Sequence, residues 1–260
     1  SNQRIDIDSN WGGIYMKSDS AVLKTFENAK EFELNKDFYA KATLDAPLIS
    51  IRAAGTSSDG ATHATFKAVS DNSAEASITL GKDATDLLQV DYVNASGHEK
   101  KQDMFYADGK NAKIDLAADQ ISLNQNYEQN ARGTTHADLR NLFLAKAGAQ
   151  INVRGQLIAN GNTSALAGSK VNLQLSNESN YTGAVFDQSY DNDSDHGSIT
   201  IKGSEVSVWN VLPYKDENDR GILFDGKEHA STVDYLSGGT ASMNDMFTVN
   251  LDRNSIINKQ

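Results

Sequence analysis

The sequence has no cysteine and only two prolines among its 260 residues. Without cysteine, the chain forms neither disulfides nor thiolate metal sites. No run approaches the ~20 apolar residues of a membrane-spanning helix, and long patterns of helical period are almost absent. Since Gly, Asn, Asp and Ser supply the turns and helical patterns are missing, the sequence favours an all-β protein.

Basic clusters are also missing, and the formal net charge is −11. This charge argues against binding to nucleic acid phosphates and against binding to anionic lipid. No charged segment followed by an apolar one marks a signal peptide, so we expect a mature or excised piece. Apolar residues make up 38% of the chain, which is enough to fill a narrow hydrophobic core.

Short runs with alternating apolar residues are present, most clearly in the segment 171–211. The runs are Val171-x-Leu173-x-Leu175, Ile199-x-Ile201 and Val206-x-Val208. A period of two predicts strands with one buried face. Because runs of three to five residues are too short to be stable alone, we expect them to stack on similar strands.

A longer repeat extends through the middle of the chain. The repeated positions are Phe66, Phe105 and Phe143, followed by Ile78, Ile114 and Ile151. The phenylalanines lie 39 and 38 residues apart, and the isoleucines 36 and 37. A repeat of near-constant length predicts stacked units, either a solenoid or the blades of a propeller.

Two architectures fit this repeat. One period could hold two coils of a parallel β-helix, each about 20 residues long, or one propeller blade. Asp-Gly and Asn-Gly pairs do not recur at blade spacing, although the hairpins of a blade would favour them. We therefore predict an all-β parallel β-helix of about a dozen coils, a rod roughly 50–60 Å long, with the three phenylalanines stacked as a ladder.

The segment 171–239 adds a resemblance to a known family. Its Tyr181-Thr-Gly-Ala184 turn, its Val208-Trp-Asn-Val211 strand and its Gly238-Gly239 pair are similar to those of pertactin-like (type V) bacterial autotransporter passenger domains. The resemblance implies a right-handed β-helix with three faces. It also implies a secreted passenger at the bacterial cell surface, tethered to the outer membrane by a C-terminal barrel that this sequence lacks.

We interpret residues 1–260 as a single β-helical passenger fragment. Residues 1–45 form N-terminal coils or a cap in this interpretation, and residues 190–197 and 214–221 form surface loops. Both loops depart from the family pattern: the first is unusually acidic and the second carries charge where a tight turn is usual.

For function, the resemblance implies an adhesin or a self-association module for aggregation and biofilm formation. Its partners would be a host-cell or bacterial surface protein or glycan, or a second copy of the chain. Neither Gly-Asp-Ser-Gly nor Gly-x-Ser-x-Gly occurs, so no catalytic residue is assigned. We expect neither enzymatic activity nor a cofactor.

The alternative is a carbohydrate-active enzyme, a polysaccharide lyase or hydrolase, because parallel β-helices also host such sites. It would use Asp residues in adjacent coils, with an arginine beside them. Candidate arginines are Arg52, Arg132, Arg140 and Arg154, and candidate sugar-stacking aromatics are Tyr92, Tyr106, Tyr127 and Tyr190. Tyrosines on strands are also ordinary packing residues.

The acidic loop holds the weak metal candidates Asp191, Asp193 and Asp195. Their spacing is that of a calcium loop, but the sixth and twelfth positions are His196 and Lys202 instead of Gly and Glu, so a helix-loop-helix calcium site is excluded. A looser cation site and a solvated acidic loop both remain open.

Three histidines, His63, His98 and His136, precede the repeated phenylalanines. They would form either a metal-binding or pH-responsive ladder or, as we favour, a duplicated polar turn position.

Overall fold

The described part of the molecule consists of strands and turns. The computed structural model describes the backbone of residues 4–9, 14–17, 20–22, 33–34, 39–55, 64–70, 75–94, 103–126, 141–176, 178–183, 185–186, 197–202, 208–211, 235–243 and 247–259. Side chains are described within 41–52, 64–70, 75–91, 103–124, 141–176, 178–182 and 197–201. In these ranges no helix has the length and apolarity that a membrane crossing requires.

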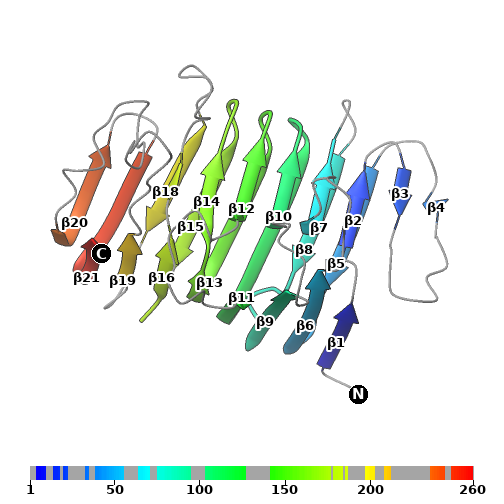
Figure 1. Ribbon diagram of the computed structural model, residues 1–260, viewed down its shortest axis with the longest axis horizontal. Coiled ribbons are helices and arrows are strands. Elements are labelled where there is room, and N and C mark those ends of the chain that lie inside the picture. The colour runs from blue at the N-terminus through cyan, green and yellow to red at the C-terminus, as the bar shows by residue number, and fades with distance from the viewer. Residues whose placement is uncertain are drawn as a thin grey trace.

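The described strands form two sheets, whose central strands follow one another in chain order along the long axis of the molecule (Figure 1). The larger sheet has 13 strands. These are β1 (Arg4–Ser9), β5 (Tyr39–Leu44), β6 (Leu48–Gly55), β8 (Glu75–Leu80), β9 (Leu87–Asn94), β11 (Ala112–Asn126), β13 (Gln150–Asn160), β15 (Lys170–Leu175), β16 (Asn180–Gly183), β18 (Ser198–Lys202), β19 (Val208–Val211), β20 (Tyr235–Met243) and β21 (Phe247–Lys259).

The smaller sheet has eight strands. These are β2 (Ile14–Lys17), β3 (Ser20–Val22), β4 (Glu33–Leu34), β7 (Ala64–Val69), β10 (Asp103–Asp108), β12 (Asn141–Lys146), β14 (Asn162–Ala165) and β17 (Val185–Phe186). Most pairings in both sheets are parallel. Neighbours in a propeller blade are antiparallel, so this pairing overturns the propeller alternative and leaves an all-β fold compatible with a parallel β-helix.

The larger sheet contains two parallel stacks of strands. Each of the two longest central strands, β11 and β13, belongs to both stacks. The first half of β11 pairs with β8 and its second half with β9. In the same way, β13 pairs with β15 through its first half and with β16 through its second. The chain therefore passes repeatedly from the smaller sheet to one stack of the larger sheet and then to the other.

The predicted phenylalanine ladder is confirmed. Phe66, Phe105 and Phe143 are in direct register on β7, β10 and β12 and are fully buried. Adjacent rings are stacked, with centroids 4.8 and 5.6 Å apart. Stacked aromatic pairs contribute about 0.5–1.5 kcal/mol each beyond area burial, so the ladder is a principal packing feature of the smaller sheet.

Aliphatic side chains stack in the same way across the larger sheet. Ile78, Ile114 and Ile151 are in register, and the column continues through Val171 and Ile199. All five are completely buried. The period of 36 to 37 residues in the sequence therefore corresponds to neighbouring strands in the core.

The register corrects the predicted length of a layer. Phe66 pairs directly with Phe105, a full period away, so one period is one layer and not two coils of about 20 residues. Later layers are shorter, since Phe143 pairs with Thr163 and Thr163 with Val185. The reason lies in the connections: residues 127–140 separate β11 from β12, whereas Gly161 alone separates β13 from β14.

In the part of the chain that the structure describes, the number of layers is correspondingly smaller than predicted. The longest stack of described strands has eight members, β1, β6, β9, β11, β13, β16, β19 and β21. At about 4.8 Å between neighbours it extends about 34 Å from first to last. Over the described strands the layers are therefore fewer than a dozen and the stack is shorter than 50–60 Å, because each early layer contains a long connection.

A buried tyrosine completes the core where the phenylalanine column ends. Tyr181 on β16 is fully buried, and its hydroxyl donates to the Gly161 carbonyl at 2.8 Å. That hydroxyl also lies 2.8 Å from the Thr163 hydroxyl. Since the phenol has one proton, Thr163 is the donor in this second bond. The aromatic ring of Tyr181 therefore lies in the core, and the hydroxyl at its end is hydrogen-bonded.

Antiparallel strands flank the parallel stacks at both ends (Figure 1). At the N-terminal end, β3 pairs antiparallel with β2 and β4 with β3. At the C-terminal end, β20 pairs antiparallel with β21. Such strands cover part of the open edges that a parallel stack would otherwise expose.

Candidate binding face

Outward positions on β5, β8, β11, β13, β15 and β18 form two adjacent columns of polar side chains, because side chains alternate between core and solvent along each strand. We call these columns the polar stripe. The first column contains Lys41, Ser77, Lys113, Gln150, Lys170 and Ser198, and the second contains Thr43, Thr79, Asp115, Asn152, Asn172 and Thr200.

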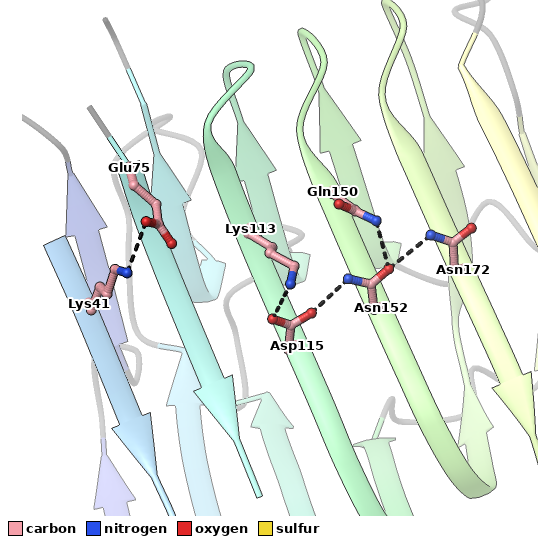
Figure 2. A network of polar contacts seen from close by, with 7 residues as sticks. All are labelled: Lys41, Glu75, Lys113, Asp115, Gln150, Asn152 and Asn172. Carbon is pink, nitrogen blue, oxygen red and sulfur yellow. Dashed lines mark hydrogen bonds and ion pairs between the residues drawn. The ribbon is translucent and has the colours of Figure 1, made fainter. Parts of the chain in front are cut away.

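Hydrogen bonds connect the centre of the stripe across three strands (Figure 2). The Asn152 amide donates to Asp115 Oδ1 at 2.7 Å, and its oxygen accepts from Gln150 at 3.0 Å and from Asn172 at 2.8 Å. The second oxygen of Asp115 lies 2.8 Å from Lys113 Nζ. These bonds fix the side chains before any ligand arrives, which lowers the entropy lost on binding.

An ion pair extends the charged part of the stripe toward the N-terminal end. Lys41 Nζ lies 2.9 Å from a carboxylate oxygen of Glu75 (Figure 2). The two side chains are 49% and 46% exposed, and a pair so exposed contributes only about 0–1 kcal/mol. Lys41 can therefore exchange Glu75 for another anion at little cost.

No sequence-predicted metal ligand lies among the residues that the structure describes. The candidates Asp191, Asp193 and Asp195 fall outside the described ranges, as do all five histidines and both predicted surface loops except Gly197. Among the residues described, no three His, Asp or Glu side chains gather as a metal site would require.

The candidate arginines with described positions are Arg52 and Arg154. Arg154 pairs with Asp83 in the turn before β9. Arg52 is in register between Asp8 and Asp91, on β1 and β9. This backbone register of Asp8, Arg52 and Asp91 is the arrangement on the described strands that comes nearest to the predicted carbohydrate-cleaving site. Arg132 and Arg140 lie outside the described residues.

Tyr106 does not act as a sugar-stacking platform. It is 7% exposed, and the amines of Lys67 and Lys146 lie 5.3 and 5.8 Å from its ring centroid. Its hydroxyl donates to Asp108 at 2.6 Å. Burial, together with this hydrogen bond, raises the pKa of Tyr106. The side chain is a packing residue under two cations. The side chains of Tyr92, Tyr127 and Tyr190 lie outside the described residues.

The polar stripe was missed by reasoning from sequence, although the sequence contains a signal for it. Each strand of the stripe carries two polar residues that flank a core residue, as in Lys113-Ile-Asp115 and Gln150-Ile-Asn152. These pairs recur with the same period as the repeated isoleucines. Their identities change from layer to layer, so the outward column becomes visible only when the register is known.

Comparison of the chain with protein-family models, curated proteins and solved structures gives no significant match.

Proposed function

We propose that the chain is a passenger domain of the pertactin-like autotransporter kind, secreted, displayed at the bacterial surface and anchored to the outer membrane. In this proposal it is a single right-handed parallel β-helix with three faces. The parallel register and the ladders of Phe and Ile support the architecture. The resemblance in residues 171–239 supports the export route.

We further propose that the domain acts as an adhesin or self-association module. The observation that carries this proposal is the polar stripe, which runs unbroken across six strands and is held together by its own hydrogen bonds. A face of this kind offers many similar weak contacts along one direction. Repetition of weak contacts produces avidity without any single strong site.

The test is a gain-of-function assay on cells. The chain is displayed on bacteria that neither clump nor attach to host cells, and settling and attachment are compared with those of cells lacking it. Clumping or attachment that requires the chain is expected. If display changes neither, the chain is not an adhesion module.

The column formed by Asp8, Arg52 and Asp91 keeps a carbohydrate-active enzyme as the second candidate. Glycoside cleavage uses a pair of carboxylic acid residues, and the register brings two aspartates to the strands on either side of Arg52. Incubation with acidic and neutral polysaccharides, followed by detection of new reducing ends or unsaturated products, separates the two functions. Sustained turnover that is abolished by Arg52→Gln would establish the enzyme and displace the adhesin.

A further inference from the structure

We propose that the polar stripe binds a linear acidic polysaccharide that lies along the stacking direction, with one carboxylate per disaccharide. This inference rests on the proposed adhesive function and names its ligand class. The first column of the stripe reads Lys41, Ser77, Lys113, Gln150 and Lys170 over β5, β8, β11, β13 and β15. A cation therefore occupies every second strand, and an uncharged polar residue lies between.

The spacing of the lysines is set by the sheet. Neighbouring strands lie about 4.8 Å apart, so residues two strands apart in one column are separated by about 9.5 Å. The repeat of an extended chain of alternating neutral and acidic pyranose rings is of comparable length. Each lysine can thus meet one carboxylate while the partly exposed Gln150 faces a neutral sugar. Ser77, which is 8% exposed, only separates Lys41 from Lys113.

The second column supplies the groups that sugar hydroxyls require. Thr43 and Thr79 offer hydroxyls, and Asn152 and Asn172 offer carboxamides, beside the lysine column. Hydroxyls and carboxamides both donate and accept hydrogen bonds, as sugar hydroxyls do. Because the network of the stripe already holds Asn152 in place, these groups are preorganised for a ligand.

The local charge of the stripe favours an anion although the whole chain is acidic. Lys41 and Lys113 are 49% and 42% exposed and pair with Glu75 and Asp115, and Lys170 is exposed. Exposed ion pairs are weak, so a polysaccharide carboxylate can replace Glu75 as the partner of Lys41. Lys113 has three N–H donors, so it can contact a ligand carboxylate while it keeps its bond to Asp115. The whole chain has a net charge of −11, and the negative charge outside the stripe repels the polymer and confines it to the stripe.

The experiment measures binding of hyaluronan oligosaccharides to the full chain by calorimetry. Hyaluronan is linear and has one carboxylate per disaccharide, and the fragment is chosen long enough to span three lysines. Replacing Lys41, Lys113 and Lys170 by Gln is expected to weaken binding at least about tenfold, since three charged contacts are lost together. Raising salt from about 0.1 to about 1 M shortens the Debye length from about 10 to about 3 Å and is expected to weaken binding as well.

Two controls separate the spacing of the stripe from its charge. Lys67→Gln, Lys110→Gln and Lys146→Gln together remove the same charge away from the stripe and are expected to leave affinity within about twofold, because exposed charges at a distance are screened. Hyaluronan whose carboxylates are methyl-esterified is expected to lose binding. Equal losses in the two triple variants, or undiminished binding of the ester, would overturn the proposal.

The two proposals fail in different assays. Absence of hyaluronan binding by the natural chain overturns the ligand class, while cells displaying the chain would still clump or attach. Absence of clumping and attachment together with intact hyaluronan binding overturns the adhesive role alone. Circular dichroism of each triple variant confirms that the strands remain folded.

Discussion

At the scale of single residues, the core depends on aromatic side chains at defined layers. Phe105 lies between two stacked phenylalanines, and Tyr181 places its hydroxyl between the Gly161 carbonyl and the Thr163 hydroxyl. Both side chains are fully buried. The first contributes through packing area and the second through packing together with two satisfied hydrogen bonds, so substitutions at the two positions have different consequences.

Phe105→Ala is expected to destabilise the fold by about 3–5 kcal/mol, because it removes a buried ring and leaves a cavity in the ladder. Phe105→Leu, which retains most of the volume, is expected to cost less. Urea unfolding at neutral pH measures both. A loss of less than about 1 kcal/mol for Phe105→Ala would show that the ladder is not part of a close-packed core.

Tyr181→Phe is expected to cost about 1–3 kcal/mol at neutral pH, since the Gly161 carbonyl and the Thr163 hydroxyl lose a buried partner. The pH dependence gives a second, independent test. Burial raises the pKa of Tyr181, and the hydrogen bond from Thr163 partly opposes this shift. The folded state therefore keeps the phenolic proton at a pH where the unfolded chain has lost it.

Stability should consequently fall as the pH rises above about 10, the pKa of an unfolded tyrosine, with about 1.4 kcal/mol per pH unit due to Tyr181. Tyr181→Phe removes this contribution, so its stability should fall less steeply than that of the natural chain. Unfolding free energies measured from neutral to strongly alkaline pH check the difference in slope. Parallel curves for the two proteins would mean that Tyr181 ionises equally in both states.

At the scale of elements, the stacks depend on the point within a long strand where the first half ends and the second half begins. The two halves pair with different neighbouring strands. Gly155 lies within β13 between its two halves, with a φ of +137°. A Cβ at this position would lie 1.9 Å from the Ala118 carbonyl oxygen of the neighbouring strand β11. Only glycine permits both this backbone conformation and this close approach.

Gly155→Ala is expected to destabilise the fold more than Gly168→Ala. Gly168 also has a positive φ, of +72°, but a Cβ there would meet nothing within 4 Å. The cost at Gly168 should thus be the conformational cost alone, about 1–2 kcal/mol. The cost at Gly155 should exceed it by at least about 1 kcal/mol, because the neighbouring backbone must move. Equal unfolding free energies for the two variants would contradict the close approach of Gly155 to the Ala118 carbonyl oxygen.

The sequence was sufficient to predict which residues stack, but not how many layers there are. Like side chains in register pack closely against one another, so the spacings of Phe66, Phe105 and Phe143 identified the ladder directly. The same spacings do not reveal how much of a period is strand and how much is connection, and this is why the layer count was too high. The polar stripe was not found because solvent-facing positions need only similar chemistry and not identical residues.

At the scale of the whole molecule, a parallel all-β scaffold carries an outward stripe with a continuous set of polar groups. The core ladders keep the strands in register. The register in turn aligns Lys113, Asp115 and Asn152 with their counterparts on neighbouring strands. Binding through this stripe would therefore depend on the stacking of the layers and not on any single loop.

The most direct test compares cells that display the natural chain with cells that display two triple variants. Lys113→Ala, Asn152→Ala and Asn172→Ala together remove the hydrogen-bonded centre of the stripe. Lys67→Ala, Asn141→Ala and Lys146→Ala make matched changes on the smaller sheet. With all three proteins folded, clumping and host-cell attachment are expected to fall to background for the stripe variant and to persist for the matched variant. Full adhesion by the stripe variant would contradict this expectation.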